Sequence, residues 1–561
     1  MTTIDKIDRR NAAAPNGHES SQSVLDAVVI GAGITGMYQT YQLREAGFSV
    51  QGYEAGSDIG GTWYWNRYPG CRLDTESYAY GYFGLSGVIP EWQWSERFAG
   101  QPELLRYLRH AAEKMDIRRS YRFNVRVTAA HFDESTNLWR LRLDDGTQAA
   151  CRYLLTAVGP LSATRMPNIP GIETFRGESF HSSRWPRGED EGPREVDFTG
   201  KRVGVIGTGA TGVQIIPIVA RTAKTLRVFQ RTPNWCTPLG NHALTPELMA
   251  QLRGYDSEAF LRFLKSTPTA FPYDRNDKKA SQATEEERQA LFESLYSMPG
   301  YGIWLSGYRD LLTSKTSNAY LAKFIANKIR ERVKDPKVAE KLIPTNHAFG
   351  TRRVPMETNY YEVYNQPNAR LVDLRETPIV EVTPDGIRTS DELHELDVIV
   401  FATGFDAVTG SLDRIDIRGK GGVALKDVWK DGPTTYLGLQ IAGFPNLFTL
   451  VGAHNGASFC NIGVCGALQV EWVTRMIKYL RDRGSALVEP DTSYQERWTE
   501  KVYEDYAKTL LRDTDAWWVK TTTGPDGQVR RRALIYIGSA PEYRALCDEM
   551  AAKGYEGFVV R

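Results

Sequence analysis

The sequence predicts an α/β protein with two Rossmann-like dinucleotide-binding domains, the second inserted in the first, and a helical insertion. Two glycine-rich motifs of the form G-x-G-x-x-G begin at Gly31 and Gly207, and each lies between a β-branched run and a helix-like segment. Two later strands end in small residues and a glycine, Gly159 and Gly404. These endings mark the expected crossings between the two domains.

The first motif has every part of a βαβ dinucleotide cradle. The run from Asp26 to Ile30 leads into Gly31, Gly33 and Gly36, and the next strand ends on Glu54. These glycines allow the tight turn, the close approach of a pyrophosphate and the packing of helix on strand, in that order. A carboxylate at Glu54 would accept hydrogen bonds from ribose hydroxyls. The motif predicts an adenine dinucleotide such as FAD, although its position does not distinguish FAD from NAD.

A loop dense in glycine and aromatic residues, 60–70, follows the first motif. Such a loop typically wraps a flat group, so Thr62 and Trp63 are candidate cofactor contacts. Asp74 and Glu76 come next, and by themselves these two residues favour a solvated surface pair.

The second motif consists of Gly207, Gly209 and Gly212. Its second strand ends on Arg231 and Thr232, at the place where the first cradle has Glu54. A carboxylate there would repel a 2′-phosphate, whereas a guanidinium pairs with it bidentately. The sequence therefore favours NADPH over NADH, with an exposed arginine at a strand end as the alternative.

Composition excludes several classes of partner. Lys and Arg number 69 against 68 Asp and Glu, so the charge balance indicates neither nucleic acid nor an anionic membrane. Six cysteines make no disulfide framework, which favours a reducing cytoplasm. The polar segment 1–23 lacks an apolar core and predicts a disordered lead-in. No apolar run is long enough to span a membrane. We expect no metal site, and a monomer or a weak oligomer.

Cys460 and Cys465 have the C-x-x-x-x-C spacing of the redox-active disulfide in some flavin reductases. In those enzymes the pair lies soon after the first cradle, whereas here it lies far downstream. We therefore favour two small buried thiols over a catalytic disulfide.

The linker between the two motifs carries the most specific pattern. The fingerprint F-x-G-x-x-x-H-x-x-x-W-P is met in full by Phe175, Gly177, His181, Trp185 and Pro186. With the loop G-G-T-W-Y-W-N-R-Y-P-G, it makes the chain resemble the class B flavoprotein monooxygenases, and specifically the Baeyer–Villiger monooxygenases. The similarity runs from about Leu25 to the C-terminus and is closest to the phenylacetone and steroid monooxygenase branch.

The resemblance implies that NADPH reduces FAD, that O₂ adds at flavin C4a, and that the peroxyflavin inserts one oxygen atom beside a ketone carbonyl to give an ester or lactone. A flavin monooxygenase that oxygenates sulfur or nitrogen is the first alternative. A second alternative is a non-catalytic redox sensor that binds dinucleotides.

The same resemblance implies a domain division. The FAD-binding domain would comprise residues 24–160 and, with a C-terminal loop region, 396–561. The NADP-binding domain would comprise residues 161–395. Within it, residues 244–344 have helical patterns and would form an insertion that caps a cleft. Candidate helices lie at 246–253, 284–296 and 317–333, and candidate strands of the first domain lie at 121–127, 139–143 and 148–158.

Arg353 matches the family's active-site arginine, and Asp74 matches the carboxylate beside it. A peroxide anion and the oxyanion of its adduct need a fixed cation, and arginine stays charged at any working pH. An unpaired guanidinium in a dry pocket is costly, so Asp74 would hold it. Arg352 falls where relatives often have a lysine that contacts the cofactor phosphate.

Other matched positions concern the pocket and the domain movement. His181 and Trp185 would couple domain movement to cofactor position. Trp517 matches a tryptophan on a mobile loop that contacts NADP, but here residues 517–525 replace the usual small G-A-N-x-P-G-K loop. The pocket-lining positions that match are Leu161, Ala457, Ser458 and Phe459.

Overall fold

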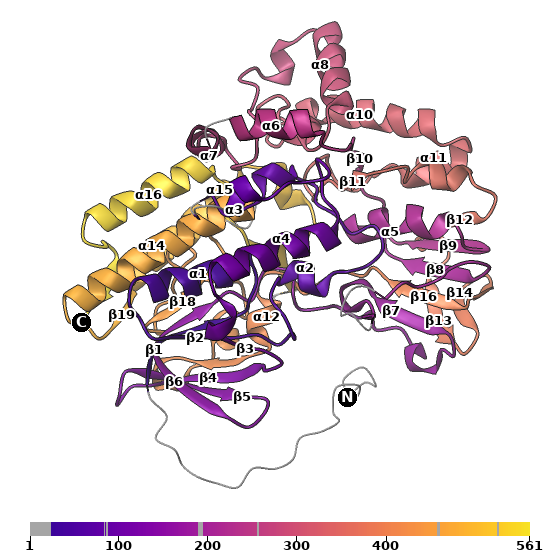
Figure 1. Cartoon of the computed structure of the whole chain (residues 1–561). Coiled ribbons are helices and arrows are strands. Elements are labelled where there is room, and N and C mark those ends of the chain that lie inside the picture. The colour runs from indigo at the N-terminus through magenta and orange to yellow at the C-terminus, as the bar shows by residue number, and fades with distance from the viewer. Residues whose placement is uncertain are drawn as a thin grey trace.

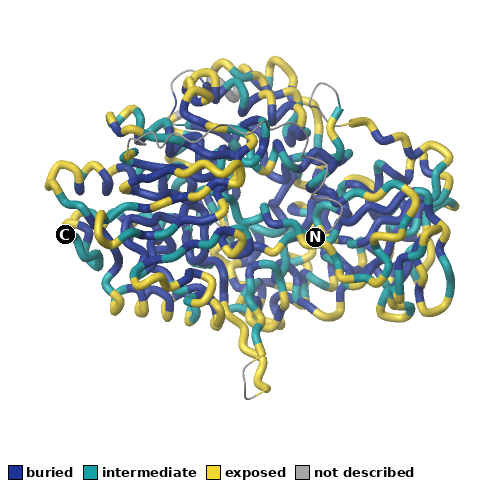
Figure 2. Tube along the Cα trace, turned by 90° about the horizontal axis from the view of Figure 1, so that it is seen from below, coloured by how far each residue is buried: buried dark blue, intermediate teal, exposed yellow. Residues whose placement is uncertain are grey.

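Two β-sheets, each beside its own hydrophobic core, organise the chain (Figures 1 and 2). The computed structural model describes residues 24–561 except 84, 86–87, 189–193, 255–256, 457–459 and 524–526. The mixed α/β architecture has the two Rossmann-like units that the glycine motifs predict.

The first sheet has the strand order β17-β4-β5-β6-β1-β2-β3, with β18 paired to β6. Its strands are β1 (Leu25–Ile30), β2 (Val50–Tyr53), β3 (Tyr121–Arg122), β4 (Val127–Asp133), β5 (Leu138–Leu143), β6 (Gln148–Thr156), β17 (Asp416–Arg418) and β18 (Leu447–Thr449). Strand β1 pairs in parallel with both β2 and β6. Helix α1 (Ile34–Glu45) connects β1 to β2, and α14 (Ile462–Asp482) packs on it.

The expected strand over 121–127 was wrong in its extent. Asn124 has a φ of 57°, a left-handed conformation that an extended strand does not contain. The segment is therefore divided into the short β3 and the longer β4, which begins at Val127. The other two expected strands of this domain correspond to β5 and β6.

The second sheet is parallel throughout, in the order β12-β9-β8-β16-β7. Its strands are β7 (Glu178–His181), β8 (Arg202–Ile206), β9 (Thr225–Gln230), β12 (Ala369–Asp373) and β16 (Val398–Phe401). The expectation that the chain returns to the first domain at residue 396 was wrong. Strand β16 is fully buried between β7 and β8, so the chain leaves this sheet only after Phe401.

The helical insertion lies above the second sheet in Figure 1. It includes α6 (Pro246–Gly254), α7 (Ser257–Ser266), α8 (Glu285–Ser297), α9 (Gly302–Leu305), α10 (Lys315–Arg332) and α11 (Pro336–Leu342). Helix α8 begins with a capping box in which Thr284 accepts from the Glu287 N–H and Glu287 accepts from the Thr284 N–H. Phe292 of α8 and Phe324 of α10 pack with ring centroids 5.7 Å apart, within the second hydrophobic core.

The C-terminal segment 462–561 packs mainly on the core of the first sheet. It contains α14, β19 (Val488–Pro490), α15 (Thr492–Ala507), the hairpin of β20 (Val519–Thr523) and β21 (Val529–Ala533), α16 (Ala540–Ala552) and β22 (Phe558–Val560). Trp472 of α14 and Trp498 of α15 are buried in that core. In the part of the chain that the structure describes, no helix is long and apolar enough to cross a bilayer.

Candidate active site

Backbone contacts at the first cradle require glycine. Gly31 has a φ of 105°, and a Cβ on it would lie 2.6 Å from the Ala157 carbonyl oxygen. A Cβ on Gly36 would lie 1.9 Å from the Gly31 carbonyl oxygen. Gly33 instead lines a cavity. The motif thus packs α1 onto β1 and leaves its turn open for a pyrophosphate.

Glu54 at the end of β2 is buried and fixed. Its carboxylate accepts hydrogen bonds from the Ala32 and Gly56 N–H groups, each at 2.8 Å. Burial raises the pKa of Glu54. Because Glu54 also lines the cavity, its remaining acceptor capacity suits the ribose hydroxyls of a bound dinucleotide. The first cradle therefore fits FAD.

A cavity of about 700 Å³ extends from the first cradle to the helical insertion. This volume is within the range of small-molecule sites. The aromatic loop contributes Thr62 and Trp63 to its wall, and the insertion contributes Phe271, Tyr301 and Trp304. The insertion thus forms part of the cavity wall.

Arg353 and Asp74 form an ion pair in the cavity wall. Arg353 Nη2 donates to Asp74 Oδ2 at 2.7 Å, and the two side chains are 37% and 4% exposed. Tyr301 contributes most to raising the pKa of Arg353, and Asp74 adds to it, against the opposing effect of burial. Since Arg353 also lines the cavity, its exposed part presents a permanent positive charge to a ligand.

The interpretation of Asp74 and Glu76 as a solvated pair was wrong. Both are buried, at 5% and 0% exposure. Glu76 Oε1 accepts from Arg97 Nη2 at 3.0 Å and from the Tyr273 hydroxyl at 2.5 Å. Each carboxylate is therefore compensated by a cation and a tyrosine from distant segments, which is what makes its burial possible.

Two residues that the sequence did not reveal complete the Asp74 site. The Tyr301 hydroxyl donates to Asp74 Oδ2 at 3.1 Å and lies 3.3 Å from Arg353 Nη2. Gln214 Nε2, from α5 (Ala210–Ala220) of the second cradle, donates to Asp74 Oδ1 at 3.3 Å. One carboxylate of the first domain thus contacts the insertion and the second domain together. Neither residue belongs to a local motif, so no sequence signal indicated it.

The second cradle repeats the first. Cβ atoms on Gly207 and Gly212 would lie 2.4 Å from the Ala402 oxygen and 2.2 Å from the Gly207 oxygen, and Gly209 is open. Arg231 is exposed, and the Thr232 carbonyl accepts a hydrogen bond from the Thr208 hydroxyl at 3.0 Å.

The positive charge of Arg231 acts on the nearby Arg352. Burial and then Arg231 lower the pKa of Arg352. Its Nε is buried and finds no hydrogen-bond partner among the described residues. Two neighbouring guanidinium groups and an unsatisfied donor suit a phosphate dianion, so this place fits the 2′-phosphate of NADP.

The fingerprint residues contact the segments that flank β7 and β16 in the second sheet. Gly177 is required because a Cβ there would lie 2.4 Å from the Asp397 oxygen. His181 Nε2 donates to the Gly404 carbonyl at 3.2 Å, and its Nδ1 accepts from the Ser183 N–H at 3.2 Å. Burial lowers the pKa of His181 to about 4, so the ring is neutral at physiological pH.

The two aromatic fingerprint residues pack close to β7. Trp185 is buried against Phe180, with ring centroids 5.1 Å apart. The ring of Phe175 lies against Gly177, where a Cβ would be 2.6 Å from Phe175 Cζ. The fingerprint therefore fixes the chain where it enters and leaves the second sheet.

The structure describes only some of the expected pocket-lining residues. Leu161 and Trp517 line the cavity, and Trp518 lines it beside Trp517. Ala457, Ser458 and Phe459 lie outside the described residues.

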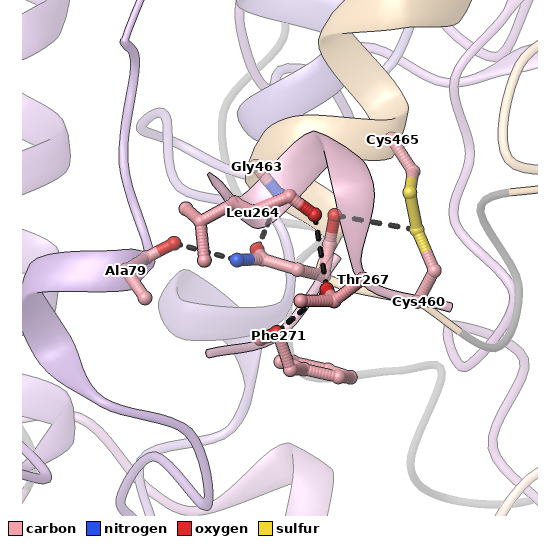
Figure 3. The surroundings of a disulfide bond; sticks show 8 residues. Ala79, Leu264, Thr267, Phe271, Cys460, Gly463 and Cys465 are labelled. Atoms are coloured by element: carbon pink, nitrogen blue, oxygen red, sulfur yellow. Dashed lines mark hydrogen bonds between the residues drawn. A yellow bond between two sulfur atoms is a disulfide. The ribbon is translucent and has the colours of Figure 1, made fainter. Parts of the chain in front are cut away.

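Figure 3 shows Cys460 and Cys465 joined as a disulfide at the start of α14. The expectation of two separate thiols was therefore wrong. Helix α14 begins at Ile462, and its first turn brings Cys465 back until the two Cα atoms lie 6.4 Å apart, which suits a disulfide. Cys460 lines the cavity next to Ile462, and Thr267 and Phe271 of the insertion lie beside the pair.

Comparisons with known proteins agree with this geometry. Residues 29–84 match the family model of an NAD(P)-binding Rossmann-like domain, and residues 86–298 match that of L-lysine 6-monooxygenase/L-ornithine 5-monooxygenase. The 2-oxo-Δ(3)-4,5,5-trimethylcyclopentenylacetyl-CoA monooxygenase of Pseudomonas putida is 63% identical, over 96% of this chain and 99% of its own. The cyclopentanone 1,2-monooxygenase of Comamonas sp. is 38% identical, over 100% and 99%.

A crystal structure of OTEMO in complex with FAD and NADP superposes with a TM-score of 0.93, at 62% identity, over 96% of this chain and 99% of that chain. FAD and NADP are thus the cofactors of an enzyme whose fold this chain shares almost entirely. The two cradles, the complete fingerprint and these full-length relatives together show that the chain belongs to the Baeyer–Villiger monooxygenases, the FAD- and NADPH-dependent enzymes that insert an oxygen atom beside a ketone carbonyl.

Proposed function

We propose that Arg353 is the catalytic cation of this monooxygenase and that Asp74 and Tyr301 hold it in place. The observation that carries the proposal is the 2.7 Å ion pair in the cavity wall, in which the carboxylate is buried and the guanidinium faces the cavity. Bound FAD, once reduced by NADPH, supplies the activation of O₂. Overall, ketone, O₂, NADPH and a proton give ester or lactone, NADP⁺ and water.

Each residue of the site has a separate task in this proposal. Arg353 stabilises negative charge on the oxygen atoms that react, and it does so without reorganisation because Asp74 and Tyr301 fix its orientation. Phe271, Trp304 and Trp517 cover the cavity with apolar surface and exclude water. At the second cradle, Arg231 and Arg352 bind the 2′-phosphate of NADPH.

We propose further that the substrate is a cyclic ketone carried on a coenzyme A thioester. The support is the relative that is 63% identical over nearly the whole chain and is named for such a thioester. Relatives named for simple ketones, such as cyclopentanone, are 40% identical or less. Oxygenation of sulfur or nitrogen as the main activity is not favoured by these similarities.

The Arg353→Ala variant tests the catalytic proposal. We expect NADPH still to reduce the bound FAD, because reduction does not use this cation, and we expect no ester to form. Flavin absorbance monitors the reduction, and gas chromatography of the organic extract measures the ester. Arg353→Lys is the matched control, since it keeps the charge but loses the planar fork, and we expect it to restore only part of the yield. Wild-type ester yield from Arg353→Ala would refute the assignment.

The substrate proposal needs a panel of three compounds: the coenzyme A thioester of a cyclopentenone-acetic acid, the free acid and cyclopentanone. NADPH consumption with product analysis gives kcat/KM for each. We expect the thioester to have the highest value. A thioester that is oxidised no better than the free acid would contradict the proposed substrate class.

A further inference from the structure

The segment after Trp517 forms a hairpin in place of the small loop of the resembled family. Strands β20 and β21 pair in antiparallel register, with Lys520 opposite Arg532 and Thr522 opposite Arg530. Directly opposite residues point to the same face of a two-stranded sheet. Three cations therefore share one face of the hairpin, in a chain whose 69 Lys and Arg in total nearly equal its 68 Asp and Glu.

This arrangement is unfavourable by itself, because like charges directly opposite each other destabilise a strand pair. Lys520 and Arg532 each have a local contact. Lys520 Nζ donates to the Trp429 carbonyl at 2.8 Å, and the Arg532 guanidinium lies 4.9 Å from the ring centroid of Tyr503. Arg530 and Arg532 are exposed to solvent. A polyanionic ligand could therefore place its negative charge against this face.

The opposite face has a different character. Arg531 alternates to that side, where its Nε donates to Asp515 at 3.0 Å. Asp515 in turn lies close enough to Arg352 to raise its pKa. The face that carries Arg531 is thus the one near the site proposed for the NADP 2′-phosphate. The face that carries Lys520, Arg530 and Arg532 is the opposite one.

The cationic face leads away from the cavity wall. The Leu534 N–H donates to the Trp518 carbonyl at 2.8 Å, so the ladder of the hairpin continues to a residue that lines the cavity. At the rise of a strand, Lys520 lies about 7 Å beyond Trp518, and the level of Thr522 and Arg530 lies about 14 Å beyond it. The cations are therefore spaced outward from the place where a ketone ring would enter.

We propose that Lys520, Arg530 and Arg532 bind the phosphate groups of a coenzyme A thioester whose ketone ring occupies the cavity. The inference rests on the proposed function for its substrate class, and it adds the site that recognises the part of the substrate outside the cavity. Guanidinium groups suit this task because they pair with phosphates bidentately.

Kinetics of the FAD-loaded Arg530→Gln/Arg532→Gln variant test the proposal. We expect the KM for the cyclopentenone-acetyl coenzyme A thioester to rise about tenfold, from the loss of two charge-assisted contacts. Neither kcat/KM for cyclopentanone nor the KM for NADPH should change. Arg531→Gln is the matched control on the opposite face and should leave the KM for the thioester unaltered. The wild-type KM for the thioester should also rise with salt, because screening weakens exposed charge pairs.

Titration of the holoenzyme with free coenzyme A separates this inference from the proposed function. Binding by the wild type that the double variant loses supports the phosphate site even if no thioester is oxidised. Oxidation of the thioester with an unchanged KM in the double variant overturns the site but keeps the substrate class. A rise in the KM for NADPH alone overturns the inference as well, because it assigns the cationic face to the other phosphate source.

Discussion

The two dinucleotide cradles have the same backbone but different residues at the end of the second strand. Gly31 and Gly207 have φ values of 105° and 108°. A Cβ added to Gly31 would lie 2.6 Å from the Ala157 carbonyl oxygen, and one added to Gly207 would lie 2.4 Å from the Ala402 carbonyl oxygen. The turn that approaches a pyrophosphate is therefore built twice in the same way, and it does not by itself decide which cofactor is bound.

The difference lies where β2 and β9 end. Glu54 is buried and held by two backbone N–H groups, whereas Arg231 is exposed and lies near Arg352. A fixed buried carboxylate suits neutral ribose hydroxyls, and two neighbouring guanidinium groups suit a phosphate. We therefore propose that the residue at the end of the second strand of each cradle contributes to cofactor specificity on a shared scaffold.

The largest effect is expected when the shared scaffold is broken. A Cβ in Gly36→Ala would lie 1.9 Å from the Gly31 oxygen, and one in Gly212→Ala would lie 2.2 Å from the Gly207 oxygen. We expect Gly36→Ala to purify without flavin. Gly212→Ala should keep its flavin, which dithionite reduces but NADPH does not. Flavin absorbance per protein measures both, with circular dichroism as a check of folding. Equal flavin loss in the two variants would show that the cradles are not independent.

Exchange of the strand-end residue should have the next largest effect. In Arg231→Glu a carboxylate faces the 2′-phosphate, so we expect the KM for NADPH to rise about 100-fold and the KM for NADH to change little. Steady-state kinetics with both nucleotides provide the measurement. Arg231→Lys keeps the charge and should retain most of the preference for NADPH. An unchanged ratio of the two KM values would mean that Arg231 does not bind the 2′-phosphate.

Tyr301 belongs to neither cradle, so its substitution should affect oxygen insertion without affecting the binding of either cofactor. Tyr301→Phe removes the hydroxyl that donates to Asp74 at 3.1 Å, and loss of one such hydrogen bond costs about 1 kcal/mol. We expect kcat for ketone oxidation to fall about fivefold while the rate of FAD reduction by NADPH is kept. Stopped-flow absorbance separates the two steps. An equal fall in both rates would indicate that Tyr301 supports the fold and not Arg353.

Local patterns in the sequence were sufficient for the cradles and insufficient for the site between them. The motifs from Gly31 and Gly207 lie within single βαβ units, where strand, turn and helix are neighbours in the chain. Asp74 was interpreted as solvated because its partners are remote: Arg353 lies 279 positions away and Tyr301 lies 227 positions away. Only the resemblance to a family brought Asp74 and Arg353 together, and it contained nothing about Tyr301.

The strand order could not be predicted from the sequence for the same reason. The buried run of β16 was recognisable as a strand, but a parallel sheet places strands by topology and not by local composition. Its pairing with β7 and β8 became visible only in three dimensions. At the hairpin of Lys520, the sequence already showed that the segment differs from the family loop. Which of its cations share a face became clear only from the strand register.

The smallest effect on turnover is expected where the chain leaves the second sheet and His181 contacts the Gly404 carbonyl. Burial lowers its pKa from 6.5 to about 4. Between these values the unfolded chain binds a proton that the folded chain does not, so stability is present above pH 6.5 and is lost as the pH falls toward 4. At pH 5 the loss from this residue is about 2 kcal/mol. His181→Gln should reduce the drop in Tm between pH 7 and pH 5 by a few degrees and leave ketone oxidation at pH 7 within about twofold. An identical drop in both proteins would show that another group, such as His454, whose pKa burial also lowers to about 4, controls the acid instability.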